Sequence, residues 1–99
     1  MTYSVSALEF MSLLDQDSAT VLDLRDEDMF DEADLPNAIK VSMTTLPSKL
    51  HQLDKTKTYY LVSQFGQRSQ AMANYLDEQG FCAINVIGGA TAYHHYLAS

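Results

Sequence analysis

The sequence has a single cysteine, few basic residues and no long hydrophobic segment. Because Cys82 is the only cysteine among the 99 residues, no disulfide can form within the chain, which fits a reducing compartment. The 6 Lys and Arg residues are outnumbered by 13 Asp and Glu, which gives a formal net charge of −7. This negative charge argues against non-specific binding to nucleic acid or to anionic membrane surfaces.

Signals for targeting and membrane insertion are also missing from the sequence. No apolar run approaches the roughly 18 residues of a membrane-spanning helix, and the first residues, Met1–Ser4, lack the basic start of a signal peptide. No repeat and no low-complexity stretch is evident. With 46% hydrophobic residues, enough for one core, the sequence predicts a single cytoplasmic domain over residues 1–99.

Short apolar segments alternate with segments of helical character along the chain. The expected strands are residues 3–5, 20–24, 38–41, 59–62 and 82–86, and the expected helices are 7–14, 26–33, 44–53, 68–79 and 91–97. This alternation predicts an α/β fold with a mainly parallel five-stranded sheet flanked by helices on both faces. In such sheets, binding sites form at the carboxyl ends of the strands.

One such strand end leads into a short loop that has the character of an anion-binding site. The loop Ser63–Ser69 follows the apolar segment 59–62 and precedes a helical segment, so free main-chain N–H groups and the helix dipole converge on it. A loop of this kind usually carries its nucleophile at the first position, where a cysteine would be held as a thiolate. Here that position is Ser63, whose hydroxyl ionises far less readily.

The loop resembles the active-site loop of the rhodanese-like sulfurtransferases, Cys-x-x-Gly-x-Arg. It reads Ser63-Gln64-Phe65-Gly66-Gln67-Arg68-Ser69. Further segments are similar to family elements in the same order: Val21–Asp26, Asp28–Phe30, Leu35–Ile39, Gly80-Phe81 and Val86–Ala90, with Tyr93 in place of the usual Trp. Because it covers essentially the whole chain, the resemblance implies a single rhodanese-like domain.

The sequence departs from the family pattern in three places. Ser63 stands in place of the cysteine that carries a persulfide, Ala33-Asp34 stands in place of Gly-His, and Asn37 replaces a common Gly. The resemblance implies a reaction in which a thiolate accepts a sulfane sulfur and passes it on. A serine hydroxyl cannot form that persulfide, so the first departure opposes catalysis.

Several loop residues allow two interpretations. Ser63 either hydrogen-bonds a bound anion or only caps the loop. Arg68 either contacts an anion with its guanidinium or braces the loop through a carbonyl or carboxylate group. Phe65 is either an anchor for a protein partner or a pocket wall packed in place. Gly66 is expected to have a positive φ.

Other polar residues are expected to be structural. Asp23 and Arg25 should tie loops together at the end of the sheet. The acidic segment 26–34 should be a solvated helix face, with a site for a basic partner as the alternative. Cys82 should be an inert buried thiol.

No metal site or cofactor is expected from the sequence. His94 and His95 are adjacent, so on a helix they point about 100° apart and should not share one zinc ion. We interpret both as surface or partly packed residues. The spacing of three or four residues that is typical of metal ligands is absent.

The leading functional hypothesis is a non-catalytic module that uses the loop to bind a small oxyanion or a protein partner. The alternative is an enzyme that transfers sulfur by another route, such as with a partner's thiol. A phosphatase is less favoured, because the related phosphatases use a cysteine in a loop about one residue longer.

Overall fold

Five parallel strands form the centre of the molecule. The computed structural model describes residues 3–15, 20–26, 35 and 38–98. The sheet has the order β1-β5-β4-β2-β3, and all four neighbouring pairs are parallel. Its strands are β1 (Tyr3–Val5), β2 (Thr20–Asp23), β3 (Ile39–Lys40), β4 (Thr58–Val62) and β5 (Cys82–Val86). The α/β fold predicted from the sequence is therefore confirmed.

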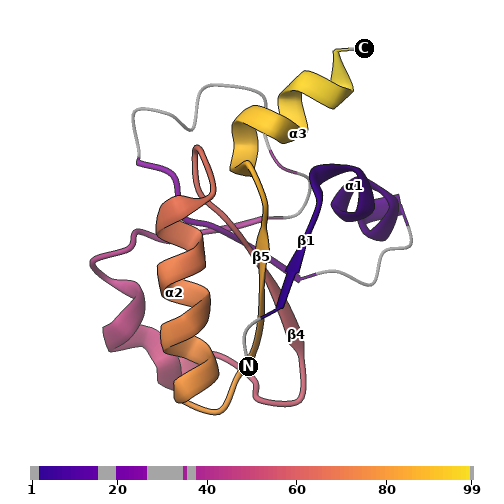
Figure 1. The fold of residues 1–99 in the computed structure, drawn as a ribbon. Coiled ribbons are helices and arrows are strands. Elements are labelled where there is room, and N and C mark those ends of the chain that lie inside the picture. Colours follow the sequence, from indigo (N-terminus) through magenta and orange to yellow (C-terminus); the bar gives the residue numbers. More distant parts are fainter. Residues whose placement is uncertain (1–2, 16–19, 27–34, 36–37, 99) are drawn as a thin grey trace.

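Helices cover both faces of this sheet (Figure 1). Helix α2 (Gln67–Glu78) and the 3₁₀ helix η2 (Leu46–Gln52) pack on one face, and α1 (Ala7–Asp15) and α3 (Gly89–Leu97) pack on the other. Helix α1 begins after Ser6, whose Oγ accepts the Glu9 N–H at 3.1 Å and donates to the Glu9 carboxylate at 3.2 Å. The Ser6–Glu9 spacing in the sequence is typical of such a capping pair.

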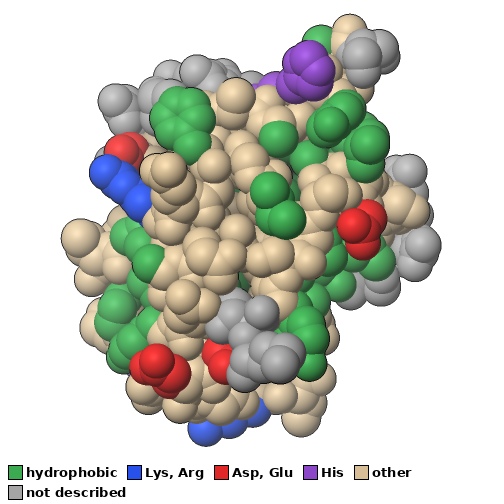
Figure 2. All heavy atoms as spheres, in the orientation of Figure 1, with side chains coloured by type: hydrophobic (Ala, Val, Ile, Leu, Met, Phe, Trp, Pro, Cys, Tyr) green, Lys and Arg blue, Asp and Glu red, His purple; other side chains and the backbone are tan. Residues whose placement is uncertain are grey.

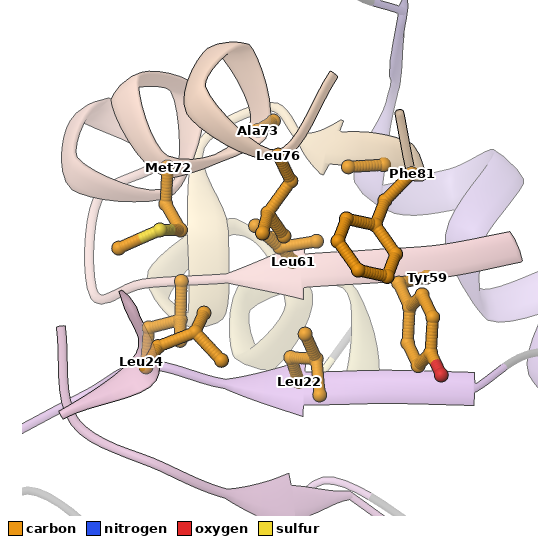
Figure 3. Packing of buried hydrophobic residues seen from close by; sticks show 10 residues of the cluster. Leu22, Leu24, Tyr59, Leu61, Met72, Ala73, Leu76 and Phe81 are labelled. Atoms are coloured by element: carbon orange, nitrogen blue, oxygen red, sulfur yellow. The ribbon is translucent and has the colours of Figure 1, made fainter. Parts of the chain in front are cut away.

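Each face of the sheet has its own apolar core. On the α2 face, Leu76 points from the helix onto Leu61 of the central strand and Met72 points toward Leu24, while the Tyr59 and Phe81 rings lie at one end of this layer (Figure 3). On the other face, Phe10 of α1 packs with Tyr93 of α3, their ring centroids 5.8 Å apart. These two apolar layers hold α2 against the sheet after β4 and α3 against the sheet after β5.

Some sequence expectations differ from the structure in detail. The segment expected as helix 44–53 is the shorter η2, with Pro47 in its first turn. The apolar pattern predicts Ala71 on the buried face of α2, but Ala71 is exposed, because Met72, Ala73 and Leu76 form that face. The acidic helix 26–33 lies outside the described residues beyond Asp26, as do Asp28–Phe30, Ala33-Asp34 and Asn37.

The prediction that Cys82 is buried is wrong. Cys82 is exposed, because it is the first residue of β5 and lies at the amino end of the sheet, where its neighbour Thr58 donates a hydrogen bond to Sγ at 3.6 Å. The thiol and the Ser63 loop therefore lie at opposite ends of the strands. Among the described residues, none of the helices has the length and apolar character needed to span a membrane.

Candidate functional site

The loop after β4 lies where the sequence predicts it, at the carboxyl end of the central strand. Strand β4 ends at Val62, Ser63 follows, and helix α2 begins at Gln67. Gly66 is the residue before the helix and has a φ of 94°, so the predicted positive φ is confirmed. The chain changes direction between the end of β4 and the start of α2, so the N-terminus of α2 lies next to the carboxyl end of β4.

The Ser63 hydroxyl lies inside this loop, and the residue is only 3% exposed. Its oxygen accepts the main-chain N–H of Gly66 at 3.1 Å and that of Ser69 at 3.2 Å. It is also 2.9 Å from the Ser69 hydroxyl oxygen. This is the geometry of a capping residue that holds the first turn of α2.

The direction of the Ser63 proton follows from the neighbours of Ser69. Ser69 Oγ lies beside two acceptors, Asn85 Oδ1 and, at 3.2 Å, the Gly66 carbonyl. Because a hydroxyl has one proton to donate, Ser69 donates to one of these and receives the proton of Ser63. The Ser63 O–H then donates one hydrogen bond and its oxygen accepts two, which is the full capacity of the hydroxyl group. Within the described residues its partners include neither a histidine nor a lysine that could act as a base.

Asn85 is a site residue that the sequence analysis missed. It is a buried polar residue in β5, 3% exposed, and its Nδ2 also donates to Gln70 Oε1 at 3.2 Å. Ser4 of β1 donates to the same Gln70 oxygen at 3.0 Å. The signal that could have identified Asn85 is that it is the one polar amide in an otherwise apolar strand, since buried amides are hydrogen-bonded.

The loop packs backbone against backbone on the turn after β5. A Cβ atom on Gly89 would lie 2.2 Å from the Ser63 carbonyl oxygen and 2.7 Å from Gly66 N. Helix α3 begins at this turn, and its first N–H groups bind the loop: Ala90 N–H donates to the Ser63 carbonyl at 2.8 Å and Thr91 N–H to the Gln64 carbonyl at 3.0 Å. Only glycine permits this approach, so the second turn fixes the shape of the first.

A cavity of about 360 Å³ opens beside the loop. One side is formed by the residues that follow β2, and the other by the loop and the start of α2. The lining residues are Leu24, Arg25, Asp26, Ser63, Gln64, Phe65, Gln67 and Arg68. Five of the seven loop residues predicted as a site therefore face one hollow, while Gly66 and Ser69 support it from behind.

Arg25 forms an ion pair with Asp23 at the floor of this region. Both side chains are fully buried, and Arg25 Nη2 lies 2.8 Å from Asp23 Oδ2. Arg25 Nε also donates to Asp23 Oδ1 at 3.0 Å, which makes the contact bidentate. A buried pair of this geometry is costly to break, because either charge left alone would lack both water and a partner.

Arg68 lies at the rim of the cavity and pairs with Asp26. Its Nη1 is 3.3 and 3.4 Å from the two carboxylate oxygens, and both side chains are about two-thirds exposed, at 65% and 67%. Phe65 at the loop tip is 68% exposed. Figure 2 shows a hydrophobic side chain next to a basic and an acidic group above the N-terminal end of α2. Of the two interpretations of Arg68, the structure shows contact with a carboxylate.

The loop retains unused hydrogen-bond donors. Within the described part of the chain, the main-chain N–H groups of Gln64, Phe65, Gln67 and Arg68 donate to no protein acceptor. Those of Gln67 and Arg68 belong to the first turn of α2, where the helix dipole favours negative charge. The site can therefore offer donors to an oxyanion, although two further loop N–H groups are already taken by Ser63.

His94 and His95 lie on α3, away from this arrangement. The His94 ring packs on Tyr93 and the His95 ring on Tyr96, with centroids 5.5 and 5.3 Å apart. The interpretation of both as surface or partly packed residues is confirmed. Among the described residues, no three or more His, Cys, Asp or Glu side chains are arranged to hold a metal ion.

Comparison with known proteins gives one consistent family. The model of the rhodanese-like domain matches residues 6–96. The thiosulfate sulfurtransferase GlpE of Coxiella burnetii is 33% identical over 98 residues, which cover 96% of this chain and 92% of that protein. YtwF of Bacillus subtilis, provisionally named a sulfurtransferase, is 38% identical over 73 residues, 74% of this chain and 71% of YtwF.

A solved structure agrees with this result at the level of the fold. A rhodanese-related protein from Thermoplasma volcanium superposes with a TM-score of 0.88 and covers 95% of this chain and 92% of its own. Its sequence identity is 24%, so this likeness concerns the fold alone.

The contact between the two turns predicts a large effect of Gly89→Ala. The added methyl group would overlap the Ser63 carbonyl, and we expect a loss of stability of about 2–4 kcal/mol, from positive φ and overpacking together. Gly80→Ala is the matched control, because Gly80 also has a positive φ, of 91°, but its nearest neighbour is the flexible Lys55 side chain at 3.4 Å. Urea unfolding of both variants measures the difference. Equal losses would contradict the proposed role of close backbone packing.

Proposed function

The chain belongs to the rhodanese-like domain family, and from that premise we propose that it is a non-catalytic member whose loop binds a small oxyanion. The observation that carries the proposal is the state of the Ser63 hydroxyl, whose donor and both acceptor positions are used within the loop. We propose that residues 1–99 act as one domain. The cytoplasmic location stays a prediction from the sequence.

Loss of sulfur transfer is supported by the chemistry of position 63. In the family pattern this position holds the cysteine that carries the persulfide, and here it holds Ser63. An alkoxide nucleophile would need a base within hydrogen-bond reach, whereas the described partners of Ser63 are two N–H groups and a second serine. Ser63 thus acts as the internal cap of the loop.

Oxyanion binding is supported by the donors that remain. The N–H groups of Gln67 and Arg68 lie at the positive end of α2, next to a cavity large enough for a small anion. The Arg68 guanidinium lies at the rim. The net charge of −7 opposes binding, so the affinity should be modest and should weaken with salt.

Sulfur transfer with a thiol from a partner is the second candidate. It is favoured by the relatives, since GlpE is named a thiosulfate sulfurtransferase and shares 33% of its residues over nearly the whole chain. Phe65, exposed at the cavity mouth, offers an apolar contact for such a protein partner. In that case the domain would bind the sulfur donor and the partner would carry the persulfide.

We predict that the isolated protein does not transfer sulfur from thiosulfate to cyanide. The reason is that a hydroxyl cannot hold a sulfane sulfur. The measurement is thiocyanate formation with wild-type protein beside an equal concentration of free cysteine as the background. Turnover well above that background would overturn the non-catalytic proposal, and persulfide found on Cys82 would support sulfur transfer by another route.

We predict weak, local binding of inorganic phosphate. Titration at constant ionic strength should shift the backbone amide resonances of Phe65–Ser69, because these groups surround the start of α2. The amides near Glu78, at the other end of the same helix, serve as the internal control. A response spread evenly over the helix, or none in the loop, would count against the anion site.

We predict that Ser63→Cys creates a thiol with a pKa below the ordinary value of about 8.5. The Gly66 and Ser69 N–H groups that now donate to the Ser63 oxygen would stabilise a thiolate, and the helix dipole adds to this effect. Burial of the side chain works in the opposite direction. The alkylation rate against pH measures the result, and wild type, whose only thiol is Cys82, gives the background. A pKa at or above about 8.5 would show that the N–H groups do not favour an anion at this position.

A further inference from the structure

Every arginine that lines the cavity is paired with a carboxylate. Arg25 is bound by Asp23 at 2.8 Å in the interior. Arg68 is bound by Asp26 at the rim, with Nη1 3.3 Å from Oδ1. The two arginines and their two aspartate partners together carry no net charge. Among the described residues, the positive potential of the cavity therefore comes from main-chain N–H groups and the helix end.

The two ion pairs differ in how easily a ligand could replace the carboxylate. The Asp23–Arg25 pair is buried and bidentate, and losing it would leave a charge without water. The Asp26–Arg68 pair is largely exposed and longer than an ideal charge-assisted hydrogen bond. Exposed pairs of this kind contribute little to stability, so an anion that enters the cavity can displace Asp26 from Arg68 without disturbing the fold.

We propose that Asp26 determines the anion affinity and the charge preference of this cavity by competing with the ligand for Arg68. The proposal rests on the function proposed above and identifies the residue that limits it. Asp26 acts in two ways: it occupies the Arg68 guanidinium, and its own charge repels an incoming anion. The repulsion is twice as large for a dianion as for a monoanion at the same distance. Asp26 therefore lowers the affinity of the site for a dianion more than its affinity for a monoanion.

Replacement of Asp26 tests this inference. Asp26→Asn keeps the size of the side chain and removes its charge, and we expect the dissociation constant for sulfate to fall about two- to fivefold, the range that an exposed ion pair allows. Nitrate, a monoanion, should gain less, so the ratio of sulfate to nitrate affinity should rise. Both anions are titrated at constant ionic strength against the amide resonances of Phe65–Ser69.

A matched control separates this effect from the change in net charge. Glu78→Gln removes the same charge from a residue at the far end of α2 and should leave both dissociation constants unchanged within error. An equal gain in Glu78→Gln and Asp26→Asn would overturn the assignment to Asp26.

The Arg68→Gln background tests the competition itself. Without the guanidinium, Asp26→Asn can relieve only direct repulsion, so its gain in sulfate affinity should be smaller than in the presence of Arg68. Equal gains in the two backgrounds would overturn the competition. Unchanged sulfate binding in Asp26→Asn, with clear binding in wild type, would overturn this inference and leave the proposed function intact. No local response in either protein would overturn both.

Discussion

The close contact between two glycine-containing turns is the constraint on which the site depends. Gly89 approaches the Ser63 carbonyl and Gly66 N so closely that no side chain fits between them. The first N–H groups of α3, those of Ala90 and Thr91, then bind the two carbonyl groups at the start of the loop. The loop is thus held from outside by α3 and from within by Ser63. Its shape is therefore set by contacts of the polypeptide backbone.

The Ser63 oxygen completes this arrangement from the inside. It takes the N–H groups of Gly66 and Ser69, which would otherwise point into the loop without a partner. A buried donor left unpaired costs about 1–3 kcal/mol. A serine at this position therefore stabilises the loop by itself, and it does so with the same donors that would stabilise a thiolate.

The sequence predicted the parts of the molecule that depend on local pattern. The strand β5, the position of the loop and the positive φ of Gly66 follow from apolar runs and from the chemistry of a turn. The parts that it did not predict depend on contacts between distant segments. Asp26 meets Arg68 across 42 positions, and Asn85 meets Ser69 across 16. The exposure of Cys82 depends on where β5 begins relative to its neighbours, which no local pattern specifies.

Among the described residues, the charged side chains that line the cavity are already paired within the protein. Its arginines are paired with carboxylates, and its serines and Asn85 satisfy one another. A ligand that binds one of these arginines must displace its carboxylate, and the buried Asp23–Arg25 pair cannot be broken without cost to the fold. Discrimination between ligands should therefore depend on the exposed rim, where the Asp26–Arg68 pair competes only weakly with a ligand. The rim can therefore be altered by substitution while the two turns and the buried network keep the loop in place.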